Sequence, residues 1–213
     1  MMNRYLFVLV ATICLVATSC SASEDPAEPD NGNKTETGFK VGDYYNHGLI
    51  KGVVFSTDEN GEHGMIVSLD EKNLKWSTLE TSVIAGATYV SLDYGLDNAD
   101  GIKGIFSNWA ETFPAVAWCS SKNPGSLNRW YLPAANELRT LLNECAGNPE
   151  LVSAIEHQSG ISVNPEVSYW SSTDGGGQIA YSYRYRENMS PDEDLYSLLP
   201  KGESHPCRCI CRF

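Results

Sequence analysis

Five cysteines are the residues best suited to chemistry in the main part of this chain: Cys119, Cys145, Cys207, Cys209 and Cys211. The last three alternate along one face of an expected strand. Neighbours at i and i+2 on a strand are about 6.5 Å apart with parallel Cβ vectors, which is a poor geometry for a disulfide. We therefore expect each of the three to seek a partner elsewhere, among Cys119 and Cys145. Five thiols cannot all pair within one monomer, so the connectivity stays open.

Catalytic and metal-binding signatures are missing around these thiols. The spacing offers neither the C-x2-C pairs of zinc sites nor a Cys-x-x-Cys redox motif. None of the four histidines lies in a His-Glu-x-x-His pattern, and the chain has no nucleophile elbow, P-loop or dinucleotide fingerprint. No spacing of acidic residues singles out a glycosidase pair. We predict that the chain is not an enzyme and has no cofactor and no metal site.

Alternation in the run 179–186 suggests binding instead. One face carries Ile179, Tyr181, Tyr183 and Tyr185, and the other carries Ala180, Ser182, Arg184 and Arg186. We expect the tyrosine face to be buried, with a stacking platform for sugar rings as the alternative. The arginine face then points to solvent, where the pair could hold an anion or form ion pairs with nearby carboxylates.

The region from Asp174 to His205 is accordingly the predicted binding surface. It follows a flexible run of three glycines and includes a polar loop over residues 188–196. The candidate ligand-binding residues are Asp174, Gln178, Arg184, Arg186 and Asn188.

Strands are expected on both sides of this region. Residues 50–56 and 64–69 have a strand pattern and flank Asn60-Gly61, a strong hairpin signal. Further β-rich stretches cover residues 83–92, 169–173 and 207–213. Residues 93–100 are rich in turn formers and predict a connection.

Two helices are expected in the first half of the domain. One begins near Pro114 and contains residues 115–119, since proline is well tolerated in a first turn. The second follows Pro133, where Leu138, Leu141 and Leu142 share one face. The whole pattern predicts an α+β fold.

The N-terminus has the order of an export signal. Arg4 precedes the apolar run 5–16, which is shorter than the roughly 20 residues needed to span a bilayer and fits the core of a signal peptide. The small residues before Cys20 resemble a bacterial lipobox, in which the cysteine is lipidated. We therefore expect a signal peptide over residues 1–19, an acidic flexible tether over 20–38, and one domain over 39–213.

Charge limits the partners. The chain has 27 acidic and 15 basic residues, for a net charge of −12. A polyanion binds nucleic acid and anionic lipid surfaces poorly, so we expect no nucleic-acid partner and membrane contact only through the lipid anchor. The acidic residues 23–25 resemble a surface-export signal of some Gram-negative lipoproteins, although ordinary linker acidity explains them equally well.

Several motifs occur in a fixed order: 52–64 (GVVFSTDENGEHG), 113–119 (FPAVAWC), 130–138 (WYLPAANEL), 170–173 (WSST) and 208–213 (RCICRF). Together they resemble the bacterial C-type-lectin-like domains typified by the C-terminal domain of collagen-like surface adhesins. The resemblance covers residues 49–213. It implies small antiparallel sheets, two helices, a long loop region that carries the binding surface, and pairing of the N- and C-terminal strands.

Within these motifs most side chains are expected to be core. We expect Trp130 and Trp170 to be buried, Glu137 to bond backbone groups, and Ser171 and Ser172 to satisfy nearby polar groups. The motifs of calcium-dependent lectins are absent, so the resemblance implies calcium-independent binding. The reactive cysteine motifs of the related sulfatase-activating oxidases are also absent, which leaves that activity a distant alternative.

The sequence thus predicts an adhesion or binding module in the bacterial envelope. Its partner would be a glycan or an extracellular or envelope protein. The lipid anchor would place it at the outer membrane, and the sequence leaves periplasmic and surface display open. The alternative is a structural subunit of a pilus or of envelope assembly.

Overall fold

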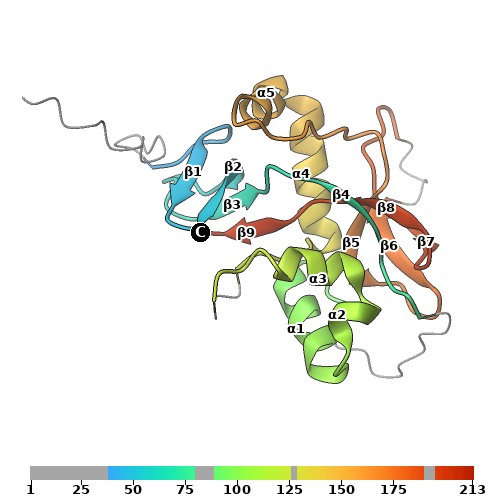
Figure 1. Ribbon diagram of the computed structural model, residues 1–213. Helices are drawn as coiled ribbons and strands as arrows, with labels where there is room; N and C mark the ends of the chain where they lie inside the picture. The colour runs from blue at the N-terminus through green and yellow to red at the C-terminus, as the bar shows by residue number, and fades with distance from the viewer. Residues whose placement is uncertain (1–37, 80–88, 126–128, 190–194) are drawn as a thin grey trace, which may run out of the picture. The chain divides into compact units, whose positions relative to one another are not determined.

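Three small antiparallel sheets and five helices make up the described part of the chain (Figure 1). This computed structural model describes residues 38–79, 89–125, 129–189 and 195–213, all within one unit, Asn31–Phe213. The predicted signal peptide, Cys20 and tether residues 20–37 lie outside the described residues. No helix among the described residues is both long and apolar enough to cross a membrane. The predicted α+β class and small antiparallel sheets are confirmed.

The first sheet contains the predicted hairpin. Its strands are β1 (Tyr44–His47), β2 (Ile50–Thr57), β3 (Gly64–Val67) and β9 (Ile210–Arg212), in that spatial order. The turn between β2 and β3 needs glycine at position 61, where φ is +69° and an added Cβ would lie 2.4 Å from the backbone nitrogen of Phe39. The backbone N–H of Phe39 donates to Gly61 (2.9 Å), and its ring packs against Tyr45 and Phe213.

The C-terminal strand returns to this sheet but does not pair with the first strand. Strand β9 pairs with β3, through Met65 and Arg212 among others, so β1 lies at the opposite edge. A tight turn at Gly48 (φ +62°) folds β1 back onto β2, so that β1 forms that edge of the sheet. The expected pairing of terminal strands therefore holds only in that both strands belong to one sheet.

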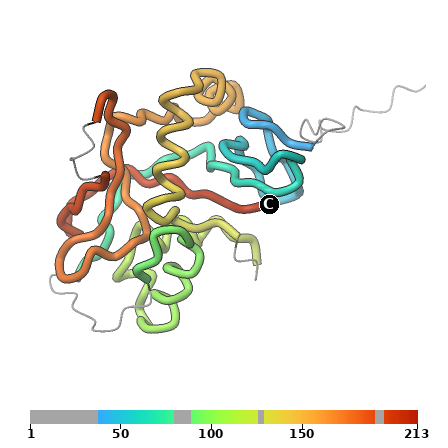
Figure 2. Tube along the Cα trace, turned by 180° about the vertical axis from the view of Figure 1, so that it is seen from behind, coloured from blue at the N-terminus to red at the C-terminus, as the bar shows by residue number. Residues whose placement is uncertain are grey.

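Two further sheets build the other side of the domain. Strand β4 (Lys72–Lys75) pairs with β8 (Ser204–Cys207). Strands β5 (Tyr169–Asp174), β6 (Ile179–Tyr183) and β7 (Ser197–Pro200) form a meander. In Figures 1 and 2 this third sheet and the first sheet lie on opposite sides of the helix Ala135–Gly147.

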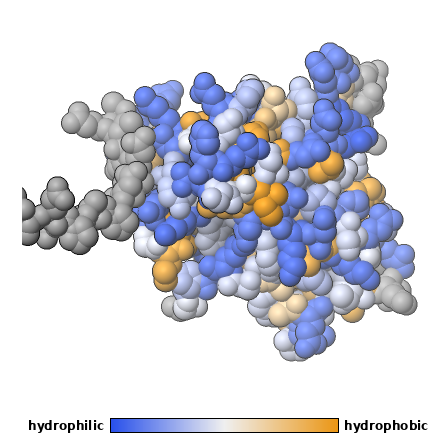
Figure 3. All heavy atoms as spheres, turned by 45° about the horizontal axis from the view of Figure 1, so that its top comes forward, coloured by the Kyte–Doolittle hydropathy of each residue, from blue (hydrophilic) through white to orange (hydrophobic). Residues whose placement is uncertain are grey.

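The two predicted helices are present as α3 (Pro114–Ser120) and α4 (Ala135–Gly147). Helix α4 packs on β2, β5 and β6, and its predicted apolar face is buried. On the face shown in Figure 3, hydrophilic residues predominate and apolar residues form small separate patches, which fits a core gathered around α4.

Three helices were not expected: α1 (Gly95–Ile105), α2 (Trp109–Thr112) and α5 (Pro149–His157). The prediction of a turn-rich connection over residues 93–100 is therefore wrong. Distant groups stabilise the start of α1, because the backbone N–H of Gly95 donates to Glu137 (3.0 Å) and the side chain of Asn98 donates to Ser172 (3.1 Å). Of the expected β-rich stretch 83–92, residues 83–88 lie outside the described residues and 89–92 form no strand.

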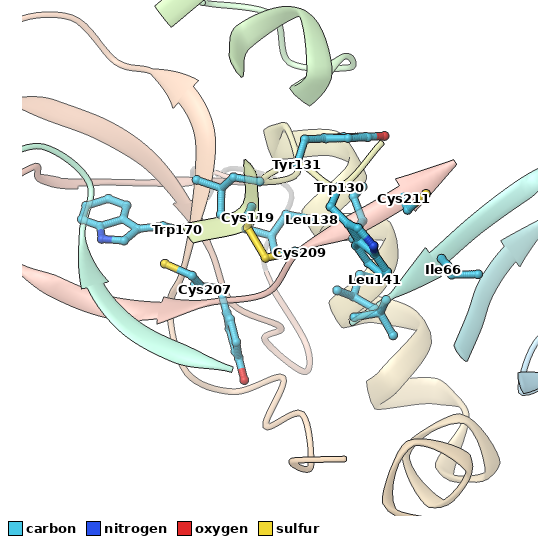
Figure 4. Close-up of a cluster of buried hydrophobic side chains, with 14 of the residues drawn as sticks. Ile66, Cys119, Trp130, Tyr131, Leu138, Leu141, Trp170, Cys207, Cys209 and Cys211 are labelled. Atoms are coloured by element: carbon cyan, nitrogen blue, oxygen red, sulfur yellow. A yellow bond between two sulfur atoms is a disulfide. The ribbon is translucent and has the colours of Figure 1, made fainter. Parts of the chain in front are cut away.

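One disulfide joins α3 to the C-terminal chain. Cys119 and Cys209, 90 residues apart in sequence, form it in the middle of the core (Figure 4). Cys209 thus finds a distant partner as expected, whereas Cys207 and Cys211 do not pair and remain buried free thiols, like Cys145. Burial raises the pKa of Cys145 to about 12 and that of Cys211 to about 11, so both are protonated at neutral pH.

Removing this disulfide should destabilise the domain strongly. A cross-link that closes a loop of this length lowers the conformational entropy of the unfolded chain and so raises the free energy of unfolding by about 4 kcal/mol. We expect Cys119→Ser with Cys209→Ser to lower the free energy of unfolding by that order in urea titrations. Cys145→Ser is the matched control, since it removes a thiol without opening a cross-link. An equal effect of both changes would contradict a cross-linking role.

Candidate ligand-binding site

Glu137, from the motif 130–138, is a structural carboxylate. Its Oε2 accepts the backbone N–H groups of Gly95 (3.0 Å) and Ala134 (2.9 Å), which confirms the predicted backbone bonding. Its Oε1 accepts from the Tyr131 hydroxyl (2.9 Å) and the Arg212 guanidinium (2.6 Å). The side chain is buried, and its hydrogen bonds connect the starts of α1 and α4 with β9.

The motif 170–173 is also core, as predicted. Trp170, Ser171 and Ser172 are fully buried. The Ser171 hydroxyl donates to the Tyr181 carbonyl (2.8 Å), and its carbonyl accepts from the indole of Trp76 (2.8 Å). The residues of these motifs are therefore part of the buried core.

Asp174 is placed inside the domain and away from the predicted arginines. Its carboxylate forms an ion pair with Lys201 at 2.6 Å, and only 4% and 1% of the two side chains are exposed. Lys201 also donates to the Gly177 carbonyl (2.9 Å) and lies 4.7 Å from the ring centroid of Trp76. No sequence pattern points to Lys201, because its partner lies 27 positions earlier, at the end of β5.

Gln178 lies in the turn between β5 and β6 and lines a cavity that contains none of the other predicted residues. It is exposed and lines a cavity of about 500 Å³ with Lys75, Thr78 and Pro200. The structure therefore separates Gln178 from the arginine pair.

Arg184, Arg186 and Asn188, three of the predicted ligand-binding residues, lie together. They line one cavity of about 420 Å³ with Tyr185, after β6 ends. Arg186 also lines a neighbouring cavity of about 580 Å³ together with Tyr181 and Tyr196. We call these two cavities the tyrosine–arginine cleft, and its principal residues are Tyr181, Arg184, Tyr185, Arg186, Asn188 and Tyr196.

The expected burial of the whole tyrosine face is wrong. Ala180 and Ser182 are the fully buried residues of β6, while Tyr181 and Tyr185 are only half-buried. The small side chains allow the strand to approach the core, and the Ser182 hydroxyl donates to the Ser197 carbonyl (3.1 Å). Tyr183 alone of the three tyrosines is buried. The alternative of an exposed aromatic platform therefore matches the geometry better.

Tyr196 holds the platform in position. Its ring meets Tyr181 and Tyr183 edge to face, with centroids 5.7 and 5.9 Å apart. Its hydroxyl donates to Asn136 on α4, and Tyr183 donates to Asn143 (2.6 Å) on the same helix. Such ring pairs are stabilised beyond the area they bury, which limits the freedom of the rings before any ligand arrives.

Charged side chains of both signs lie around this platform. Burial raises the pKa of Tyr183, while the charges of Arg139 and Arg186 act in the opposite direction. Glu166 and Glu187 also line the cavity of about 420 Å³, where their negative charges offset the positive charges of the arginines. In the described ranges, no three His, Cys, Asp or Glu side chains gather in a way that could hold a metal ion.

Breaking the buried ion pair should cost much more than breaking an exposed one. Asp174→Asn leaves the charge of Lys201 uncompensated, so we expect a loss of about 3–5 kcal/mol in the free energy of unfolding. The control is Asp100→Asn, which removes an exposed ion pair with Lys103 and should cost under about 1 kcal/mol. Chemical denaturation measures both, and similar losses would refute the structural role of Asp174.

Comparison with known proteins yields a shared fold and no family. No known protein family matches the chain, and no curated protein is similar in sequence. A solved structure, a fimbrial protein from Bacteroides ovatus ATCC 8483, is similar with a TM-score of 0.53 at 20% identity over 70% of this chain. The chain spans only 36% of that protein. At this identity the likeness shows the fold alone.

Proposed function

We propose that the protein is a lipid-anchored envelope module with a C-type-lectin-like fold that binds a glycan or a protein without calcium. The tyrosine–arginine cleft carries the proposal. It combines half-buried aromatic rings, which stack on apolar faces, with arginines, whose planar guanidinium binds carboxylate and sulfate or phosphate groups through paired hydrogen bonds. No catalytic step is assigned to the chain.

The position of the cleft supports a module that presents its binding surface away from the membrane anchor. Residue 38, where the tether would join the domain, adjoins the first sheet through Phe39. The cleft is lined by residues of β6 and of the segments that follow β6 and precede β7. Figures 1 and 2 show that the third sheet, which contains β6 and β7, lies on the other side of α4 from the first sheet. A domain tethered in this way would present the cleft away from its anchor.

Loss of the arginines should weaken binding without unfolding the domain. We expect Arg184→Ala with Arg186→Ala to reduce affinity for an anionic ligand found on a glycan and matrix-protein array by at least tenfold. Arg129→Ala is the matched control because Arg129 is exposed outside the cleft. Chelation with EGTA should leave binding unchanged. A folded wild-type protein that binds nothing on the array, or binds only with calcium, would refute the proposal.

A structural role in a pilus or in envelope assembly is the second candidate, favoured by the fold shared with a fimbrial protein. In that case the partners of the domain would be other bacterial envelope proteins. Crosslinking in intact cells should then recover a regular set of envelope subunits, and it should do so equally with the double arginine variant. Loss of the crosslinks in that variant would instead assign those contacts to the cleft.

A further inference from the structure

An exposed apolar strip lies outside the tyrosine–arginine cleft. The side chains of Val90, Leu92 and Tyr94 are 55%, 37% and 56% exposed. They lie in the segment before α1, which bends at residues 92 and 93, where the Ser91 hydroxyl accepts from the backbone N–H groups of Asp93 (3.3 Å) and Tyr94 (3.0 Å). Single apolar residues on a surface are ordinary, but three exposed within five positions make this segment unusual for the domain.

The strip is held rigidly from behind. The carbonyl of Tyr89 accepts from the backbone N–H of Asp174 (3.0 Å), and that of Ser91 accepts from the Thr173 hydroxyl (2.7 Å). The next carbonyl, of Leu92, accepts from the backbone N–H of Asn136 (2.7 Å). The apolar side chains are therefore exposed on a fixed frame tied to β5 and α4.

Asn136 joins this strip to the cleft. Its amide donates to Asp93 (2.5 Å), the residue between Leu92 and Tyr94, and its oxygen accepts from the Tyr196 hydroxyl. Tyr196 in turn packs against Tyr181, which lines the cleft together with Arg186. Direct contacts thus run without a gap from Asp93 to the cleft.

The ring of Tyr94 is oriented so that a ligand ring could stack on it. The guanidinium carbon of Arg212 lies 5.7 Å from its ring centroid, and Arg212 is itself fixed by Glu137 at 2.6 Å. A cation positioned over a ring is attractive, so the half-exposed tyrosine is oriented before a ligand arrives. Pre-oriented rings lose little conformational entropy on binding.

We propose that Tyr94 forms a second subsite, so that the protein binds a linear glycan spanning from Tyr94 to the cleft. This inference rests on the proposed binding function. A linear glycan repeats the same apolar ring faces along its length and can cover two aromatic stations with polar Asp93 and Asn136 between them. A sugar of one or two residues occupies only the cleft. Two linked contacts raise affinity because the second forms within the same complex.

The experiment compares chain lengths. Linear polymers of galacturonate, of glucuronate-containing repeats, of β-glucan and of xylan are offered to the full chain as fragments of two and of eight sugars. For any polymer that binds, we expect the octamer to bind at least tenfold more tightly than the dimer. Tyr94→Ala should abolish that advantage and leave dimer affinity unchanged, whereas Tyr181→Ala should weaken both lengths. Tyr94→Phe should retain the advantage.

Controls separate this inference from the function on which it rests. Leu49→Ala removes a still more exposed apolar side chain from the turn between β1 and β2 and should change nothing. Equal affinity for dimer and octamer, or an octamer advantage that survives Tyr94→Ala, overturns the second subsite while the binding function stands. Binding of none of the polymers, including the case in which only a protein ligand binds, overturns the glycan assignment and the subsite together.

Discussion

The guanidinium of Arg208 is enclosed where the C-terminal chain passes from β8 to β9. It donates to the carboxylate of Glu71 (3.1 Å), the carbonyl of Ser68 (2.9 Å) and the carbonyl of Ile161. Glu71 also accepts from the hydroxyl of Tyr169 (2.7 Å) on β5. A buried charge is tolerated only when its hydrogen bonds are satisfied, so segments from all three sheets must meet correctly around this group. The placement of one sheet against another depends on it.

The aromatic rings of the cleft are held in place by contacts with β6 and α4. The rings stand on β6 and the residues before β7, and the inner side of β6 is closed by Ala180 and Ser182. Behind them, α4 fixes Tyr183 and Tyr196 through Asn143 and Asn136. Sites built on such elements are positioned more accurately than sites on long loops, because packing locks the side chains. The motifs that resemble C-type-lectin-like domains therefore act as support for a surface whose residues lie outside them.

Local signals predicted local structure well. Asn60-Gly61 predicted the hairpin, and Pro114 at the first residue of α3 and Pro133 shortly before α4 marked the helix starts. Helix α1 could not be found in this way, because distant side chains stabilise its first turn. Alternation along 179–186 identified a strand but not which face is buried, since either face of a central strand can meet the core. The alternation also singled out the arginines that line the cleft, whereas the ion pair of Asp174 with Lys201 joins the end of β5 to the residue after β7, which no sequence spacing reveals.

The ring of Phe39 packs against both Tyr45 and Phe213 and so bears on how the proposed tethered module would carry force. Flow or cell movement would pull such a module between the proposed anchor and its ligand. Tension entering at residue 38 would reach Phe39, and the contact with Phe213 would pass part of the load to β9 and its partner β3. The load would then be shared within the sheet, and the edge strand β1 would not have to resist peeling alone.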